Sequence, residues 1–248
     1  MMNKQLIIVE DAAHLAQKGA ELFAGIAARS VTMNGQFSVA LSGGSTPRPM
    51  NRLLAAEPYA SQIPWQDTHI FMVDERMLPF EDPQSNFVAL KADLLEKVPA
   101  VEGQIHPMPV WLEPEAAAAA YIRKLEVFFG NSGHKAPVFD LILLGIGSDG
   151  HTASLFPEVM AGLPAAPWVL AVRGGSPAVW RLTLNVTVLN QARHVCFLAS
   201  GPEKSNIVRE LLAENTSPLP AQMIAPVAGS LTFILDRLAA AQLPGSNR

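Results

Sequence analysis

The segment DLILLGIGSDGHTASLFP, residues 140–157, joins a continuous apolar run to a glycine-rich polar turn. An apolar run of this length is typical of a strand that is buried on both faces of a parallel sheet. Gly145, Gly147 and Gly150 leave room for something to come close to the backbone. Asp149 and His151 lie beside the last of these glycines. The segment therefore predicts a buried strand that ends in a loop with reactive side chains.

Similar short runs recur along the chain and alternate with amphipathic stretches, a pattern that favours a layered α/β fold. Helical periodicity follows the N-cap residue Asp11, with Leu15, Leu22, Phe23 and Ile26 on one face. Further helices are predicted within residues 85–98, 113–129 and 202–213, and strands at 5–9, 37–42, 69–75, 139–145, 168–174 and 194–200. No linker marks a boundary, so we expect a single domain over residues 1–248, with right-handed crossovers.

The composition is that of a globular protein, with 49% hydrophobic and 16% charged residues among 248. The net charge of −4 gives no reason to expect a nucleic-acid partner. The single cysteine, Cys196, excludes an intrachain disulfide and is expected to fill the core. The N-terminus does not resemble a signal peptide, and no apolar run reaches the roughly 18 residues that suggest a membrane span. We expect a cytoplasmic protein, either a monomer or a small homo-oligomer.

Three predicted strands end in unusual polar loops: SGGSTP at 42–47, DER at 74–76 and GIGSDGH at 145–151. Ligands of parallel α/β sheets bind beyond the carboxyl ends of the strands. If the three strands are parallel neighbours, their loops meet in one crevice. The sequence therefore predicts a ligand site built from these three segments.

The first of these loops suits an anion. Its glycines permit close backbone approach, and free N–H groups at the start of a helix attract negative charge. Thr46 is expected to cap that helix, with Pro47 at its first position. A phosphate site and a simple capped turn both fit the loop, whose candidate binding residues are Ser42, Gly43, Gly44, Ser45 and Thr46.

The third loop matches the nucleotide pattern G-x-G-x-x-G at residues 145–150. Pro157 interrupts the long helix that this motif requires, and no acidic residue ends the next predicted strand, although Arg173 leaves an alternative partner for a nucleotide. A Walker A motif is set aside because His151 takes the place of its lysine. We interpret His151 as a candidate general base that Asp149 orients, with a loop histidine bonded to backbone as the alternative.

Charged residues in the other segments are candidates for binding the ligand. Asp74 and Arg76 are expected to point into the crevice, where a guanidinium matches carboxylate or phosphate oxygens. Arg181 begins a predicted strand and Lys204 begins a predicted helix. Each of these four could instead be a solvated surface charge. No HExxH motif and no Cys/His cluster with metal spacing occurs, so no metal is expected.

Taken in order, the motifs resemble the 6-phosphogluconolactonase family over nearly the whole chain. They are LSGGSTPRPM, VDERMLPFEDPQSNF, LLGIGSDGHTASLFP, WRLTLNVTVLNQARHVCFLASGPEK and LPAQMI…GSLTFILDRLAA. The wider superfamily includes glucosamine-6-phosphate deaminases. The resemblance implies a modified Rossmann-like fold, a three-layer α/β/α arrangement with a mostly parallel central sheet.

The resemblance also implies roles for individual residues. SGGST corresponds to the family's phosphate-side loop, His151 to its general base and Arg76 to a residue that stabilises charge at the substrate. Arg181 and Lys204 correspond to positions that bind the phosphate group. Asp149 would orient the imidazole, and Asp74 shares the catalytic segment with Arg76.

The implied reaction is hydrolysis of 6-phospho-D-glucono-1,5-lactone to 6-phosphogluconate, in the oxidative pentose phosphate pathway. A δ-lactone is an activated ester, so a positioned water, a base and oxyanion donors suffice, without a cofactor. Two alternatives stay open: an amino-sugar-phosphate deaminase or isomerase, and a non-catalytic sugar-phosphate sensor. Deaminases of the superfamily carry an acidic residue five positions after the histidine. That position here is Phe156, and Glu158 lies two residues beyond it.

Overall fold

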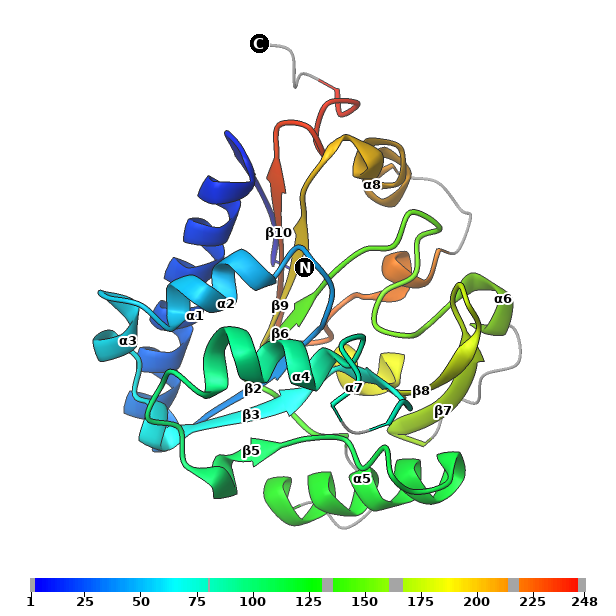
Figure 1. The fold of residues 1–248 in the computed structure, drawn as a ribbon. Coiled ribbons are helices and arrows are strands. Elements are labelled where there is room, and N and C mark those ends of the chain that lie inside the picture. The colour runs from blue at the N-terminus through cyan, green and yellow to red at the C-terminus, as the bar shows by residue number, and fades with distance from the viewer. Residues whose placement is uncertain (1–2, 80, 131–135, 161–166, 214–218, 245–248) are drawn as a thin grey trace.

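The structure is a computed structural model that describes residues 3–79, 81–130, 136–160, 167–213 and 219–244. A seven-stranded sheet crosses its centre, and all its strand pairs are parallel (Figure 1). The strand order is β1 (Asn3–Val9), β10 (Ser230–Asp236), β9 (His194–Ala199), β6 (Leu141–Leu144), β2 (Phe37–Leu41), β3 (Thr68–Met72) and β5 (Ile105–His106). The neighbours β6, β2 and β3 are the strands that carry the three predicted loops, so the expected convergence is confirmed.

A second, antiparallel sheet of three strands modifies this layout. It consists of β4 (Asp74–Arg76), β8 (Val179–Leu184) and β7 (Val169–Gly174). The prediction that 69–75 forms one strand was wrong, because β3 ends at Met72 and the DER segment joins the second sheet. Val73 links the two sheets: its N–H donates to Leu41 O (2.9 Å) and its carbonyl accepts from Leu184 N (2.8 Å).

The strand predicted at 168–174 forms β7, but it does not belong to the parallel sheet as expected. Only four residues separate β7 from β8, and parallel strands need a crossover of a dozen or more. The two strands therefore form an antiparallel hairpin. Their burial alternates more than that of β2 or β6, with Arg173 exposed on β7.

The longest helix, α1 (Ala12–Asn34), begins as predicted: Asp11 accepts hydrogen bonds from the backbone of Ala13 and His14. Its buried face contains Leu15, Phe23 and Ile26, and it lies beside α2 (Arg48–Leu54) at one side of the sheet (Figure 1). The remaining helices are α3 (Tyr59–Gln62), α4 (Asn86–Leu90, continued by a π-helical turn at Lys91–Leu95), α5 (Pro114–Phe129), α6 (Pro157–Met160), α7 (Val186–Leu189) and α8 (Ser205–Leu212). Helix α5 packs against β7 and β8 of the second sheet.

The core lies between the central sheet and these helices. The sheet strands β2 and β6 are buried along their whole length, and Phe23, Phe37 and Tyr121 are fully buried around them. Cys196 is also fully buried, and burial raises the pKa of its thiol, as expected for a cysteine that fills the core. Among the described residues, no helix is long and apolar enough to cross a membrane. The layered α/β class predicted from the sequence is confirmed, and the antiparallel sheet is its modification.

Candidate active site

A cleft of about 390 Å³ opens where β2, β3 and β6 end. It lies between the central sheet and the second sheet, and segments far apart in the sequence form its walls. The residues that line it are Ala12, Leu15, Ser42, Gly43, Gly44, Ser45, Thr46, Pro47, Pro49, Asp74, Arg76, Asn86, Gly145, Ile146, Gly147, His151, Ala153, Arg181, Ser200, Glu203 and Lys204. Of the residues predicted to bind or react, all but Asp149 line this cleft.

Asp149 lies behind His151 and bonds to it. The Asp149 carboxylate is 2.6 Å from His151 Nδ1 and also accepts the backbone N–H of His151 at 3.1 Å. Partial burial of Asp149 opposes ionisation, but the hydrogen bonds and charge of His151 outweigh it, so the pKa of Asp149 lies below its usual value. An ionised carboxylate only accepts, so Nδ1 carries the hydrogen. The neutral imidazole then has its lone pair on Nε2, the form that a general base needs.

The glycine pattern of this loop has a different cause from nucleotide binding. A Cβ at Gly147 would collide with the His151 ring and the Asp149 carboxylate. The loop closes tightly, because Gly147 N–H donates to His151 O at 2.8 Å and Gly150 N–H donates to Gly147 O at 3.0 Å. The group that approaches the glycine is therefore the protein's own His–Asp pair. The following helix, α6, begins only at Pro157, whereas a dinucleotide site places the start of a helix directly at the glycine loop.

Asp74 is a buried carboxylate at the floor of the cleft, 5% exposed. It accepts the Ser154 hydroxyl at 2.6 Å, and its backbone oxygen accepts Asn86 Nδ2 at 3.0 Å. Burial raises the pKa of Asp74, while the bond from Ser154 and the charges of Arg181, His151 and Arg76 oppose that rise. Asp74 therefore lies within electrostatic reach of three basic groups of the same cleft.

Its neighbour Glu75 has a structural role that sequence reasoning did not find. The buried Glu75 carboxylate accepts backbone N–H groups of Arg76, Asn86 and Phe87 at 2.7–2.8 Å and the Ser85 hydroxyl at 3.0 Å. Burial raises the pKa of Glu75, and these four donors oppose the rise. Two of the N–H groups belong to the first turn of α4, so Glu75 ties that helix to β4 and holds Asn86 at the cleft.

Asn86 was also not predicted as a site residue. Its side chain fills the space beside Gly43, where a Cβ would collide with it. The SNF motif contains Asn86, but no spacing rule separates a cleft asparagine from one that only begins a helix.

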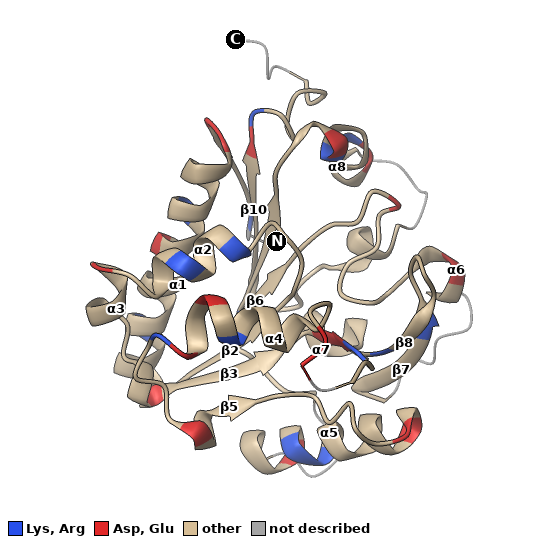
Figure 2. Cartoon of the chain, in the orientation of Figure 1, with Lys and Arg blue, Asp and Glu red and all other residues tan. Residues whose placement is uncertain are grey.

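Two arginines lie side by side on neighbouring strands of the second sheet. Arg76 on β4 and Arg181 on β8 are register partners, and the charged positions of these strands lie side by side (Figure 2). Arg76 Nη1 donates to Gln84 O at 2.5 Å, and Arg181 Nε donates to Gly174 O at 3.3 Å. Both guanidinium groups keep further donors for an anion in the cleft.

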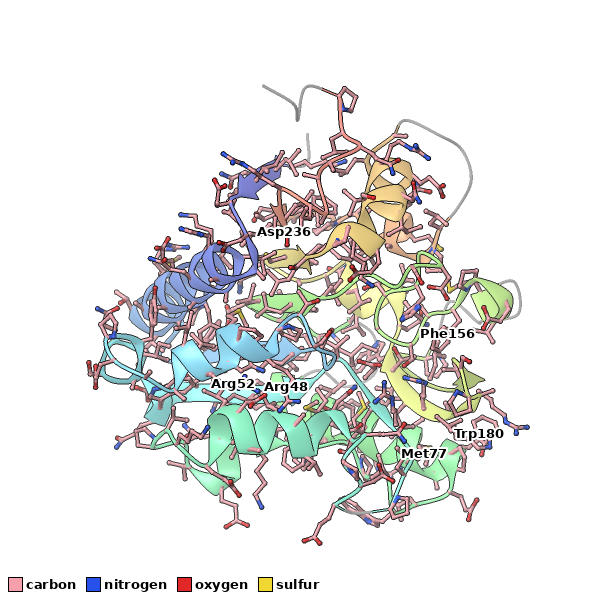
Figure 3. The ribbon with its side chains drawn as sticks, turned by 45° about the horizontal axis from the view of Figure 1, so that its top comes forward. Arg48, Arg52, Met77, Phe156, Trp180 and Asp236 are labelled. Carbon is pink, nitrogen blue, oxygen red and sulfur yellow. The ribbon has the colours of Figure 1, made fainter. Side chains whose placement is uncertain are left out.

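Phe156, which is labelled in Figure 3, contacts both His151 and Arg181. Its ring is 2% exposed, with its centroid 4.7 Å from that of His151 and 5.3 Å from Arg181 Cζ. The aromatic side chain therefore fixes the base and one arginine relative to each other, through ring contact and cation–π attraction.

The SGGST loop reaches the cleft as expected, but its capping differs from the prediction. Helix α2 begins at Arg48, Pro47 is its N-cap, and no side chain caps it, so the capping role of Thr46 was wrong. Proline at that position leaves Thr46 one residue too early to bond into the first turn. Ser42 donates its hydroxyl to Leu143 O at 2.9 Å, which joins this loop to β6.

Lys204 completes the cleft from the carboxyl end of β9, the strand beside β6. It ends a 3₁₀ turn (Pro202–Lys204) between β9 and α8 and is half-buried. Within the described ranges Lys204 makes no ion pair, although Glu203 of the same turn also lines the cleft. Over the same ranges, no three His, Cys, Asp or Glu side chains group closely enough to hold a metal ion.

Fold and cleft together define a layered α/β protein whose cleft holds a His–Asp pair and three basic side chains, an arrangement suited to a small anionic ligand. The sequence matches the family of glucosamine-6-phosphate isomerases/6-phosphogluconolactonase over residues 10–233, and the chain belongs to that family. A 6-phosphogluconolactonase of Synechocystis sp. is 36% identical over 220 residues, which are 87% of this chain and 88% of that one.

Solved structures agree with this assignment. A 6-phosphogluconolactonase from Trypanosoma cruzi superposes with a TM-score of 0.85 at 31% identity, covering 98% of each chain. A monomeric glucosamine-6-phosphate deaminase superposes with a TM-score of 0.80 at 21% identity, covering 96% of this chain and 99% of that one. The second likeness concerns the fold alone, so the two activities of the family must be told apart by the cleft.

Proposed function

We propose that this protein is a 6-phosphogluconolactonase, which hydrolyses 6-phospho-D-glucono-1,5-lactone to 6-phosphogluconate. The observation that carries the proposal is the His151–Asp149 pair at 2.6 Å, in a cleft that also holds Arg76, Arg181 and Lys204. The cleft thus offers a base for the reactive ester of a substrate and cations for a phosphate that lies several atoms from that ester. The relatives that share most of the chain carry the same activity in their names.

The first step is attack by water on the lactone carbonyl. His151 Nε2 removes a proton from the water while its oxygen bonds to C1, and the carbonyl oxygen becomes an oxyanion. The Asp149 carboxylate holds the Nδ1–H and stabilises the imidazolium that forms. Asp74 lies within electrostatic reach of the same imidazole. Arg76 stabilises the oxyanion as charge develops there.

The second step opens the ring. The oxyanion re-forms the carbonyl, the bond between C1 and the ring oxygen breaks, and the imidazolium gives its proton to the leaving oxygen. The product is a hydroxy acid that ionises in water, and His151 returns to its neutral form. Arg181, Lys204 and the backbone of the SGGST loop bind the phosphate and so align C1 with the base. These steps use only groups of the protein, the lactone and one water molecule.

The cleft favours a lactonase over a deaminase. Ring opening and isomerisation of an amino-sugar phosphate need more than one positioned acid–base group. The position five residues after His151 holds Phe156, whose buried ring neither gives nor accepts a proton. Glu158 is exposed on α6 and does not line the cleft. A sensor without catalysis would not require the His151–Asp149 pair. The proposal includes a cytoplasmic location and a small-molecule substrate in place of nucleic acid.

The deciding experiment follows proton release from freshly prepared 6-phosphogluconolactone, with the spontaneous rate subtracted. We expect strong acceleration, much weaker action on unphosphorylated gluconolactone, and no ammonia from glucosamine 6-phosphate in the same preparation. Ammonia release at a rate comparable to lactone hydrolysis would make the deaminase assignment the better one. Binding of phosphorylated sugars without turnover of any of them would favour the sensor.

A further inference from the structure

Asp236, the last residue of β10, lies outside the cleft but bonds to a segment that enters it (Figure 3). The side chain is 2% exposed. Its carboxylate accepts the Ser200 hydroxyl at 2.5 Å, Gly201 N–H at 3.0 Å and Ala239 N–H at 2.7 Å. One buried group therefore organises both the turn that leaves β9 and the turn that leaves β10.

The bonding of Asp236 is that of an acceptor that orients neutral donors. No lysine or arginine of the described chain pairs with it, and the adjacent Arg237 instead donates to Glu10 at 2.6 Å. An ionised carboxylate has no donor hydrogen, so it accepts from a hydroxyl and two backbone N–H groups at once. An asparagine of the same shape would turn an N–H₂ group toward one of those donors. A side chain that only accepts hydrogen bonds therefore suits these three partners better than one that also donates.

The segment that Asp236 holds supplies Ser200, Glu203 and Lys204 to the cleft. Gly201 has a φ of 100°, and the N–H of Lys204 donates to its carbonyl at 3.1 Å, so Lys204 is one tight turn away from the anchored residue. The Ser200 hydrogen is committed to Asp236 and cannot donate to a ligand anion. Anion recognition on this segment therefore depends on Lys204, and the position of Lys204 depends on Gly201.

We propose that Asp236 is a positioning residue for anion binding: it fixes segment 200–204 so that Lys204 meets the phosphate of the substrate. The inference rests on the proposed function for the identity of that anion. Asp236 itself contacts neither substrate nor reacting atoms. It acts through the segment, so its loss affects binding of phosphate more than the chemical step.

The test is Asp236→Asn, which keeps the shape and removes one acceptor. We expect KM for 6-phosphogluconolactone to rise about tenfold, with kcat within about twofold of wild type and with hydrolysis of unphosphorylated gluconolactone unchanged. In a Lys204→Ala background, Asp236→Asn should have little further effect, because both act on the same contact. Ser200→Ala should show the same pattern more weakly, and it replaces Asp236→Asn if that variant does not fold.

Asp140 supplies a control at another buried carboxylate. It accepts the backbone N–H and hydroxyl of Ser38 at 2.9 and 2.8 Å and also pairs with Arg193 at 3.2 Å, but it precedes β6, at the end of the sheet opposite the cleft. Asp140→Asn should lower the melting temperature and leave KM unchanged. The inference is overturned if Asp236→Asn also lowers only the melting temperature, if KM falls, or if the effects of Asp236→Asn and Lys204→Ala are additive.

Failure of the proposed function would be seen separately, as a wild-type protein that does not accelerate lactone hydrolysis. In that case calorimetric binding of 6-phosphogluconate to the wild type, Asp236→Asn and Asp140→Asn decides about Asp236 alone. Weaker binding in Asp236→Asn only would support the positioning role, and equal binding in all three would reject it.

Discussion

A histidine bonded through Nδ1 to an aspartate occurs at two places in the described chain. His14 bonds to Asp11 at 2.9 Å on the exposed first turn of α1, and His151 bonds to Asp149 at 2.6 Å. The two pairs share their chemistry but differ in surroundings, because only His151 lines the cleft and lies near Asp74, Arg76 and Arg181. Reactivity at this scale depends on the neighbours that a residue meets after folding.

This contrast gives the first prediction. His151→Asn should slow lactone hydrolysis about 10²–10⁴-fold, the usual effect of a lost general base, with an unchanged melting curve. His14→Asn is the matched control and should leave the rate as in wild type. The measurement is the initial rate of proton release at saturating lactone. A rate for His151→Asn within twofold of wild type would remove this histidine from the mechanism.

The two cations assigned to the phosphate give the second prediction. Arg181→Ala and Lys204→Ala should each lower kcat/KM for the phosphorylated lactone by about 1.5–3 kcal/mol, the strength of a hydrogen bond to a charged group. Hydrolysis of unphosphorylated gluconolactone should change little, since it lacks the group that they bind. Arg173→Ala, an exposed arginine on the neighbouring strand β7, serves as the control. Equal losses on both lactones would show that these residues do something other than bind phosphate.

Among single elements, the loop after β6 was the most predictable from sequence and the one most open to misinterpretation. Its glycines correctly indicated close approach to the backbone. The same residues match a nucleotide-binding motif. Sequence alone does not say whether a phosphate or a protein side chain fills the space beside the glycine backbone. The structure places the His151 ring and the Asp149 carboxylate there.

Gly147→Ala tests that interpretation, and it is the third prediction. The added methyl group would displace the His151 ring from Asp149, so kcat should fall by about 10²-fold while the protein stays folded. Gly145→Ala is the steric comparison in the same loop, because a Cβ there meets nothing within 4 Å. The rates of the two variants are compared under identical conditions. A loss for Gly145→Ala as large as that for Gly147→Ala would mean that the collision is not the cause.

The elements that sequence reasoning misplaced share one cause. The 69–75 run and the 168–174 run both have the composition of buried parallel strands. The first run divides between β3 of the parallel sheet and β4, and the second forms β7; both β4 and β7 pair with β8. Composition reports burial, whereas sheet membership depends on which backbone groups meet. The four-residue connection from β7 to β8 carried that information in the sequence. The break at Val73 did not, because it arises from hydrogen bonds to Leu41 and Leu184, far away in the chain.

Over the whole molecule, the sequence predicted that three loops meet, and all of its predicted site residues except Asp149 line the cleft. The prediction was possible because parallel strands carry their loops to one edge. Asn86, Glu75 and Asp236 were not predicted as site residues. Their roles depend on contacts between segments distant in sequence, such as Asp236 with Ser200, and a single sequence holds no local signal for them.

The proposed mechanism also predicts how the intact enzyme responds to metal removal. His151, Asp149 and Arg76 supply the base and the charge stabilisation that lactone hydrolysis needs. Exhaustive chelation followed by dialysis should therefore leave kcat and KM unchanged, measured against a mock-treated sample. A rate that is lost on chelation and restored by one divalent ion would contradict the mechanism.

A pair of histidines far from the cleft predicts how stability depends on pH. His69 Nδ1 is 3.2 Å from His106 Nε2, and the His106 ring stacks on Phe71 with centroids 4.1 Å apart. Burial lowers the pKa of His106 to about 4, helped by the charges of Lys124 and His69, and burial also lowers the pKa of His69. The pair is neutral in the native protein at neutral pH.

The sign of the effect follows from proton uptake. In the unfolded chain both histidines titrate at about pH 6.5. Below that pH the unfolded state therefore binds protons that the native pair does not bind. The pair's contribution to stability is therefore complete above about pH 6.5 and is lost as the pH falls toward 4, at a cost of at most about 3 kcal/mol for His106.

His106→Phe keeps the stacking on Phe71 and removes the titration. Its free energy of unfolding, from urea melts at about pH 7 and about pH 4.5, should fall less between those values than that of wild type. His14→Asn, at an exposed position, should retain the wild-type difference. If the free energy of unfolding of His106→Phe falls as much as that of wild type, other groups cause the acid sensitivity.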